Sequence, residues 1–310
     1  HCAQRVKLLF RRKNRKYNAK MKFSNIEINR ECRNCKKEKL FDCHNHTWYS
    51  HDSQCDPEML CRCAVSKGLL GIAFTDHCDM EYVNQTDIAT PICNSAEDSR
   101  RCGRIYAGQL KILTGIEIGE AIWHFREAEE IVQMIPYDII LGSVHAVRSR
   151  LGRAPYSQID FSGFTDDEID SYMRTYFDDM SEMIERCDFN VLSHLTCPLR
   201  YITGKYGIPI NMEKYEVQII QILRQIIKKK IALEINTSNK NSVYDVYMPM
   251  RKIIEQYHMM GGYLITVGSD AHVAENTGHM LGQACEMLKE IGFTELYYYQ
   301  NRKPVPYPLL

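Results

Sequence analysis

Nine residues with metal-binding side chains come at or just after the ends of short apolar runs. They are His44, His46, Asp52, His77, Glu117, His145, His194, Asp270 and His272. A single histidine at such a place is more often a hydrogen-bonded structural residue than a ligand, but nine such positions in one chain rarely arise by chance. Imidazole and carboxylate groups are ligands that zinc, manganese and iron accept. The pattern therefore predicts a metal site.

The spacing of two of these histidines has a direct physical meaning. His44 and His46 are two positions apart, so at the end of an extended strand both side chains project to the same side and can bind one ion. A carboxylate such as Glu117 can bridge two ions. We expect a multinuclear centre, which lowers the pKa of a bound water and neutralises charge on a phosphate ester during hydrolysis.

The apolar runs alternate with amphipathic stretches of helical length. Strands are expected at 40–43, 70–75, 111–116, 138–144, 189–193, 231–236 and 263–269, and outer helices at 166–187 and 213–230. Another helix is expected to begin with Asp56 as N-cap and Pro57 as its first residue, and to end at Gly68. Repeated strand–helix units predict an α/β fold of the barrel type, with its active site at the C-terminal ends of the strands.

The composition is that of one large domain, because 45% of the 310 residues are hydrophobic and 25% are charged. The formal net charge is zero, so an anionic substrate must be bound by a local site rather than by an overall field. No apolar stretch approaches the ~18 residues of a membrane span, and no secretion signal opens the sequence. We therefore expect a cytoplasmic enzyme without a membrane partner, whose 13 cysteines are reduced thiols.

Residues 1–38 differ from the rest, because lysine and arginine crowd a segment with little apolar periodicity. We interpret this segment as a poorly ordered basic extension, ahead of a barrel domain at 39–303. It is either a solvated arm or a contact for RNA or another anionic surface. The pair Cys32 and Cys35 lacks a second pair nearby, so a zinc knuckle is not expected.

Two common catalytic motifs are absent from the sequence. There is no glycine-rich phosphate loop of the Walker type and no Gly-x-Ser-x-Gly elbow. Nucleotide-driven chemistry and acyl-enzyme chemistry are therefore disfavoured.

Six short motifs together resemble the polymerase and histidinol phosphatase (PHP) superfamily, and within it the histidinol-phosphate phosphatases. In family order they are His44–Thr47, Phe74–His77, Gly115–Glu117, Leu141–His145, Ser193–Leu195 and Gly268–His272. The resemblance covers roughly residues 40–300. It implies a distorted TIM-like (βα)7 barrel that holds three divalent metal ions, which can be zinc, manganese or iron, at its mouth.

The resemblance also implies how the ligands are shared among the ions. The first ion would be bound by His44, His46, Glu117 and Asp270. The second would be bound by Asp52, His77 and His272. The third would be bound by His145 and His194 together with Glu117, which bridges. Family members carry either histidine or aspartate at position 52. We expect Asp52 to be the ligand, with the neighbouring His51 as the alternative.

The resemblance to the histidinol phosphatase branch rests on the stretch 194–201, in which an arginine follows the metal-binding histidine. Arg200 offers a planar fork of donors suited to phosphate; the alternative is a surface salt bridge. Asn236 is expected to face the mouth and Glu234 to support the site. Glu120 either receives the amine of an amino-alcohol substrate or opens a helix.

The expected reaction is the attack of a metal-bridging hydroxide on histidinol phosphate, which yields L-histidinol in histidine biosynthesis. A metal-bound water, or an acid near Asp52 and His272, would protonate the leaving alkoxide. A PHP phosphoesterase for another small phosphate or a nucleotide would share every metal ligand. A non-enzymatic protein that binds metal or nucleic acid is the third hypothesis, and it would have to explain why Arg200 and open strand-end loops accompany the ligands. The basic extension slightly favours nucleic acid, but we do not expect nucleic acid as a partner.

Overall fold

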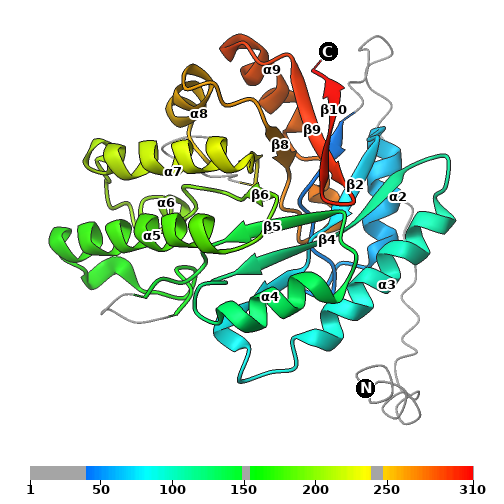
Figure 1. The fold of residues 1–310 in the computed structure, drawn as a ribbon, viewed down its shortest axis with the longest axis horizontal. Coiled ribbons are helices and arrows are strands. Elements are labelled where there is room, and N and C mark those ends of the chain that lie inside the picture. The colour runs from blue at the N-terminus through cyan, green and yellow to red at the C-terminus, as the bar shows by residue number, and fades with distance from the viewer. Residues whose placement is uncertain (1–39, 149–153, 239–246, 310) are drawn as a thin grey trace. The chain divides into compact units, whose positions relative to one another are not determined.

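A parallel barrel forms the centre of the computed structural model, which describes residues 40–148, 154–238 and 247–309. The basic extension expected at 1–38 lies outside the described residues. The barrel strands follow one another in the order β1 (Phe41–Asp42), β2 (Gly71–Phe74), β4 (Lys111–Gly119), β5 (Ile139–Ser143), β6 (Val191–Leu192), β7 (Ala232–Asn236) and β8 (Ile265–Gly268). Each pairs in parallel with the next. The expected α/β barrel of seven strands is confirmed (Figure 1).

The barrel is closed by contacts between the first and last strands of this order. The backbone N–H of Cys43 donates to the carbonyl of Val267 at 2.9 Å, and the N–H of Asp270 donates to the carbonyl of His44 at 2.8 Å. The buried carboxylate of Asp42 accepts hydrogen bonds from the backbone N–H groups of Ser269 and Gly278. These bonds join β1 to β8 along one junction, the β1–β8 seam, which closes the barrel.

The helices surround the strands. They are α2 (Pro57–Lys67), α3 (Ala89–Ile105), α4 (Phe125–Met134), α5 (Asp166–Arg186), α6 (Pro198–Ile202), α7 (Glu216–Lys229), α8 (Arg251–Met259) and α9 (Leu281–Ile291). Short 3-10 turns lie at Met80–Tyr82, Phe161–Gly163, Met212–Tyr215 and Ala274–Asn276. Within the described ranges, no helix is both long enough and apolar enough to cross a membrane.

The predicted helix ends have the expected local chemistry. The carboxylate of Asp56 accepts a hydrogen bond from the N–H of Glu58 at 2.7 Å, and Gly68 ends α2 in the left-handed conformation with φ 75°. On α5, Thr165 and Glu168 form a reciprocal capping box. These caps fix where the helices begin and so how long the loops at the barrel mouth are.

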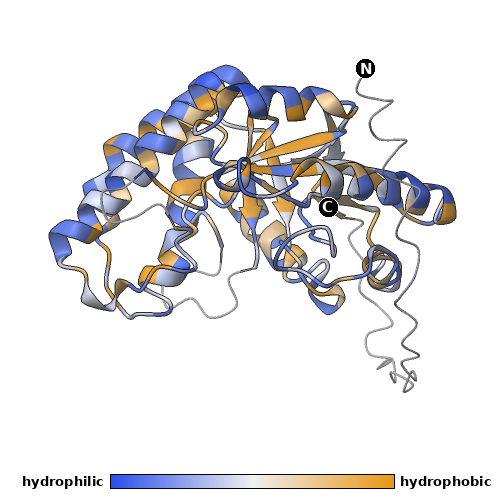
Figure 2. Cartoon of the chain, turned by 90° about the horizontal axis from the view of Figure 1, so that it is seen from below, coloured by the Kyte–Doolittle hydropathy of each residue, from blue (hydrophilic) through white to orange (hydrophobic). Residues whose placement is uncertain are grey.

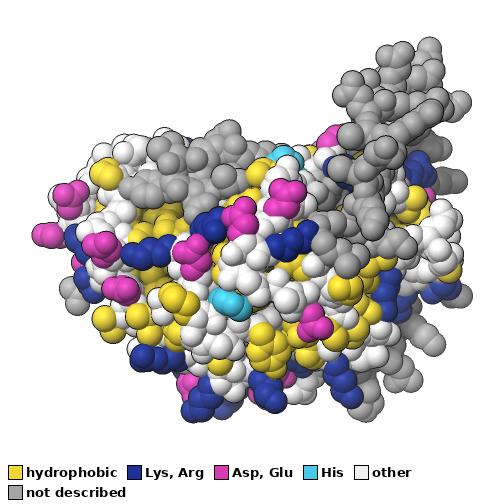
Figure 3. Space-filling model, turned by 90° about the horizontal axis from the view of Figure 1, so that it is seen from above, with side chains coloured by type: hydrophobic (Ala, Val, Ile, Leu, Met, Phe, Trp, Pro, Cys, Tyr) yellow, Lys and Arg dark blue, Asp and Glu magenta, His cyan; other side chains and the backbone are white. Residues whose placement is uncertain are grey.

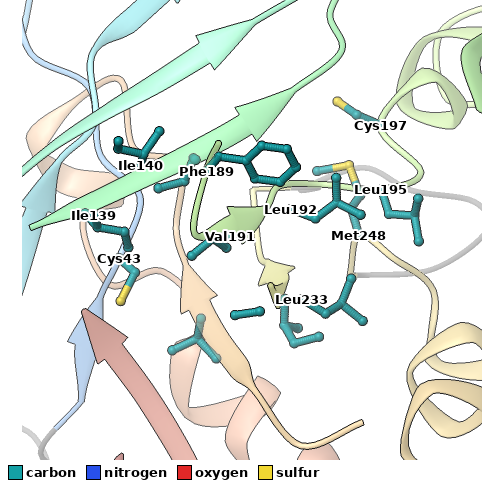
Figure 4. Packing of buried hydrophobic residues seen from close by; sticks show 14 of the residues in the cluster. Cys43, Ile139, Ile140, Phe189, Val191, Leu192, Leu195, Cys197, Leu233 and Met248 are labelled. Atoms are coloured by element: carbon teal, nitrogen blue, oxygen red, sulfur yellow. The ribbon is translucent and has the colours of Figure 1, made fainter. Parts of the chain in front are cut away.

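Apolar side chains fill the barrel and the layer beneath the helices. Figure 2 shows hydrophobic residues concentrated in the central strands, while the surrounding helices mix both kinds. In Figure 4, Phe189 lies beside Ile140 and Leu192, and all three are buried. A Cβ at position 142 would come within 2.8 Å of the Phe189 ring, so glycine is required there. This packing holds β5 and β6 in place at the mouth.

A hairpin of β9 (Glu295–Gln300) and β10 (Lys303–Pro308) was not anticipated, and the expected domain end at 303 falls on the first residue of β10. Its turn residues Asn301 and Arg302 have positive φ angles of 50° and 61°, as two-residue hairpin turns require. The Tyr298 ring stacks on Phe41 at 4.0 Å, and Asn301 donates to Asp138. The hairpin therefore covers the N-terminal ends of the barrel strands, opposite the mouth.

The surface carries both signs of charge. On the face drawn in Figure 3, lysine and arginine side chains are interspersed with aspartate and glutamate among hydrophobic groups. The described part of that face thus shows no extended area of a single charge.

Candidate metal centre

All nine predicted residues lie together at the C-terminal mouth of the barrel. His44 and His46 follow β1, His77 begins the short strand β3 (His77–Asp79), and His145 and His194 follow β5 and β6. Asp270 and His272 follow β8, and Asp52 lies in the turn before α2. Glu117 differs from the expectation, because β4 continues to Gly119 and holds Glu117 within the strand, where β3 pairs with it.

The fully buried carboxylate of Glu117 is the centre of the cluster. Its Oε1 lies 2.8 Å from Nε2 of His194 and 3.3 Å from Nε2 of His145. Its Oε2 lies 3.0 Å from Nδ1 of His77 and 3.3 Å from Nε2 of His44. Burial alone would raise the pKa of Glu117, but the surrounding histidines outweigh it and hold that pKa well below its usual value.

The ligand atoms fall into compact sets. In each set all atoms lie within 4.8 Å of one another, and the sets are His44, His46 and Glu117; His46, His77 and His272; Glu117, His145 and His194; and His77, Asp79 and His145. Ligands about 2.1 Å from one ion stand up to about 4.2 Å apart, so these sets come within a few tenths of an ångström of the size of a divalent-ion site. The chemistry also fits, because imidazoles and carboxylates are grouped in a buried place.

Two further carboxylates complete the expected groups. Oδ1 of Asp270 lies 3.2 Å from Nε2 of His46 and 3.6 Å from Nε2 of His44. Asp52 contacts both His272, at 3.1 Å, and His77, at 3.6 Å. The neighbouring His51 is half-exposed and lies 3.8 Å from Asp79. Asp52 thus contacts both histidines of the second group, whereas the His51 ring lies 5.1 Å from that of His77.

Outer hydrogen bonds decide which ring nitrogens face inward. Nδ1 of His44 lies 2.7 Å from Oε1 of Glu234. Ser50 donates its hydroxyl proton to Asp76 at 2.7 Å, so it accepts from Nδ1 of His46, 3.0 Å away. With Nδ1 carrying the proton, Nε2 of His46 keeps its lone pair for an ion. The expectation that Glu234 supports the site agrees with this contact.

Asp79 was missed by the sequence analysis, although it follows His77 at the same two-residue spacing as His44 and His46. Its Oδ1 lies 3.0 Å from Nδ1 of His145, which leaves Nε2 of that ring facing Glu117 and His194. A Cβ on Gly119 would collide with the Asp79 carboxylate and reach the His145 ring. Glycine at this position is therefore needed for the contact.

Glu120 is buried at the end of β4, with a positive φ of 48°. Its carboxylate accepts hydrogen bonds from the backbone N–H groups of His145 and Ala146. Burial raises its pKa to about 8. The next helix begins only at Phe125, so Glu120 does not open a helix; it positions the loop that carries His145. Asp270 also has a positive φ, 51°, a conformation that costs energy outside glycine and is common at functional sites.

Arg200 lies beside the cluster in an open pocket of about 570 Å³, whose other walls include Tyr156, Gln158, Tyr201 and His272. Its Nη2 donates to the hydroxyl of Ser238, and its Nε has no hydrogen-bond partner among the described residues. No carboxylate in the described ranges forms an ion pair with it. The alternative of a surface salt bridge therefore does not describe this side chain.

A parallel α/β barrel with histidines and carboxylates converging at its mouth defines the class of metal-dependent hydrolases. The chain belongs to the PHP domain family, because the profile of that family matches residues 42–238.

The chain is similar over most of its length to named relatives. It is 27% identical over 263 residues to a probable histidinol-phosphatase of Clostridium acetobutylicum, covering 84% of this chain and 96% of the relative. It is 26% identical over 270 residues to a histidinol-phosphatase of Lactococcus lactis, covering 86% and 96%. The fold resembles a crystal structure of histidinol phosphate phosphatase from Lactococcus lactis with zinc, L-histidinol and phosphate, with a TM-score of 0.73, 24% identity and coverage of 86% and 99%.

Proposed function

We propose that this protein is a metal-dependent phosphatase that hydrolyses histidinol phosphate to L-histidinol and phosphate, a step of histidine biosynthesis. The observation that carries the proposal is the shared carboxylate of Glu117, which four histidines surround at 2.8–3.3 Å, beside a pocket that presents Arg200. The relatives that match nearly their whole length bear the name histidinol-phosphatase, which supports the same substrate.

The residues present fit three divalent ions. His44, His46, Glu117 and Asp270 would hold the first, and Asp52, His77 and His272 the second. Glu117, His145 and His194 would hold the third. Ions bound there supply a water of lowered pKa and offset charge on phosphoryl oxygens. Zinc is the first ion to test, because the related Lactococcus structure contains it.

The chain's own groups bind and orient the phosphate ester. The guanidinium of Arg200 is a planar donor that suits phosphoryl oxygens, and it lies on the pocket wall beside the metal-binding residues. Its positive charge, in a half-buried site, stabilises the negative charge that develops on the phosphoryl oxygens in the transition state.

The leaving alkoxide requires a proton from a group that lines the same pocket. Asp52 and His272 both do, and Oδ2 of Asp52 lies 3.1 Å from Nε2 of His272. Burial works against charge on both groups, but their hydrogen bond outweighs it, so that the pKa of Asp52 is lowered and the pKa of His272 is raised. These shifts describe the protein without metal. With both groups holding the second ion, the proton would come from a metal-bound water or from another acid near Asp52 and His272.

The remaining wall suits the organic part of the substrate. Pro155, Tyr156, Ser157, Gln158 and Tyr201 line it. The rings of Tyr156 and Tyr201 lie 5.2 Å apart at a tilt of 38°. Such rings offer flat apolar faces, against which an imidazole packs well.

Phosphate release from histidinol phosphate tests the proposal, beside a panel of nucleotides and sugar phosphates, with zinc- or manganese-loaded protein. We expect histidinol phosphate to be hydrolysed with the highest kcat/KM. Hydrolysis of the panel in preference to histidinol phosphate would replace this substrate by another small phosphate ester or a nucleotide. The absence of any hydrolysis by metal-loaded protein would leave a metal-binding protein that is not an enzyme. The Asp270→Ala variant, measured in parallel, controls for a contaminating phosphatase.

A further inference from the structure

Three polar residues on β7 and just beyond it alternate along the chain. Glu234 and Asn236 lie on β7, and Ser238 follows two positions later. Side chains at every second position of an extended segment project to one face. Here that face is the barrel mouth, because all three side chains form hydrogen bonds with residues of the metal centre or the pocket.

The Ser238 hydroxyl joins two groups with different tasks. It accepts a hydrogen bond from Nη2 of Arg200, and it lies 3.0 Å from Oδ2 of Asp270 and 2.6 Å from Oδ1 of Asn236. A hydroxyl has one proton and two lone pairs. It can therefore accept from Arg200 while it donates to Asp270 or Asn236.

The two oxygens of Asp270 have separate surroundings. Oδ1 faces the ring nitrogens of His46 and His44, whereas Oδ2 lies within hydrogen-bond distance of Ser238 and of the Asn236 amide, at 3.0 and 3.3 Å. One carboxylate thus faces the metal centre on one side and the Ser238 hydroxyl on the other.

Other contacts of Arg200 hold it less firmly. Its short helix α6 has five residues. Apart from Ser238, its guanidinium has a 3.8 Å contact with the sulfur of Met248 and lies beside the Tyr201 side chain of its own helix. That methionine is itself buried near Leu195 in the core (Figure 4). A thioether is a weak acceptor, so the serine makes the strong directional bond.

We propose that Ser238 is a positioning residue, which fixes the guanidinium of Arg200 relative to Asp270 and so sets the distance between the phosphate-binding donor and the metal centre. The inference rests on the proposed phosphatase function. Its consequence is specific: Ser238 acts on the affinity for the phosphoryl group, and it does so through Arg200.

The test uses Ser238→Ala and Ser238→Thr in the full chain, with Ser181→Ala on α5 as the control. Ser181 bonds to Gln225 on α7, and neither residue lines the pocket. Calorimetry measures the Kd of inorganic phosphate for zinc-loaded protein, elemental analysis measures bound zinc, and thermal unfolding checks the fold. Steady-state kinetics with histidinol phosphate separates KM from kcat.

We expect Ser238→Ala to weaken phosphate binding and raise KM about tenfold, the usual size for a hydrogen bond to a charged group, while zinc content stays at the level of the unaltered protein. Ser238→Thr restores the hydroxyl and should restore phosphate binding. In an Arg200→Ala background, Ser238→Ala should add almost nothing, because the two residues act as one unit.

Unchanged phosphate affinity in a folded, zinc-loaded Ser238→Ala protein would overturn the proposal. The proposal would also be overturned if the loss of phosphate affinity in Ser238→Ala added fully to the loss in Arg200→Ala, since Ser238 would then act independently of the arginine. Loss of zinc without loss of phosphate affinity would make Ser238 a support of Asp270 alone, which also contradicts it. The binding of inorganic phosphate does not depend on which ester is hydrolysed. If the protein failed to hydrolyse histidinol phosphate, the proposed substrate would be refuted, but the phosphate affinities would still test the role of Ser238.

Discussion

Oε1 of Glu234 on β7 lies 2.7 Å from Nδ1 of His44, which follows β1 and is separated from β7 by β8 alone. Its other oxygen accepts a hydrogen bond from the backbone N–H of His194 at 2.9 Å. One buried carboxylate therefore orients a ring at one end of the chain and the backbone of a ligand from its middle. Such outer partners fix the tautomer and the ring angle of histidine ligands.

Replacing Glu234 by glutamine should weaken zinc binding about 10- to 100-fold, the usual effect of losing an outer carboxylate partner. The amide keeps the shape but loses the charge that favours Nδ1–H of His44. Competition with a chromophoric chelator measures the affinity. Glu286→Gln on the exposed side of α9 is the control, and equal affinities in the two variants would contradict the assigned role.

Replacing Asp270 by alanine should remove a metal ion and lower kcat by more than about 100-fold, beyond the range for outer partners. Oδ1 of Asp270 is close to both His44 and His46, so no neighbouring group can replace it. Elemental analysis and phosphate release are measured on the same sample. His145→Ala should lose the third ion and lower kcat in the same way. Full turnover in either variant, with all its metal bound, would refute the ligand assignment.

Metal binding should release protons, and zinc affinity should rise with pH. In the metal-free protein, burial lowers the pKa of His145, but Glu117 and Asp79 outweigh it and raise that pKa well above its usual value. The pKa of His44 is raised by Glu234, Glu117 and Asp270 in the same way. These rings therefore carry protons near pH 7, which an ion must displace.

The same shifts fix the sign of the pH dependence of stability without metal. A raised histidine pKa stabilises the fold fully below the unfolded value of about 6.5, and the contribution is lost as pH rises through the folded value.

The release of protons by the protein is measured with an indicator dye in weakly buffered solution, to which zinc is added. A zinc affinity that is flat between about pH 6 and 8 would count against protonated ligands in the free protein.

Loss of the capping box of α5 should affect stability and leave turnover intact. Thr165 and Glu168 satisfy each other's backbone N–H groups, and removal of a threonine cap costs about 1 kcal/mol. Urea unfolding of Thr165→Ala measures the change in the free energy of unfolding. Thr165→Ser keeps the hydroxyl and should be close to the unaltered protein; a large drop in kcat for Thr165→Ala would show that α5 also shapes the site.

Deletion of residues 1–38 should leave histidinol phosphate hydrolysis unchanged, because every group assigned to the site lies at or beyond His44. Initial rates of the full and shortened proteins check this. Binding of both proteins to RNA and DNA is measured beside them. A nucleic-acid affinity that disappears with the segment would give the basic extension a role of its own.

The barrel strands and most of the site could be predicted because apolar runs in a parallel sheet end abruptly where the chain leaves the core. His145 and His194 directly follow such runs. Glu117 was expected just past a strand that ends at Ile116, but Ile118 and Gly119 extend β4 and pair with β5. A glutamate inside a strand is unusual, and it is stable here only because histidines from other strands surround it.

The outer partners could not be assigned from sequence alone. Ser50 and Asp76 look like ordinary loop residues until the fold places them behind His46. The C-terminal hairpin left a visible signal, the three consecutive tyrosines 297–299 before Asn301 and Arg302. Its position over the strand starts depends on tertiary contacts with Phe41 and Asp138.

The seam between β1 and β8 has a consequence for synthesis of the protein. His44 and His46 leave the ribosome early, while Asp270 and His272 emerge some 220 residues later, and large domains gain their long-range contacts only once the distant segments exist. A growing chain therefore exposes clustered histidines without the aspartate that completes the first ion site. The centre can mature only after translation has passed β8 and the ligands that follow it, so metal loading follows synthesis of that segment.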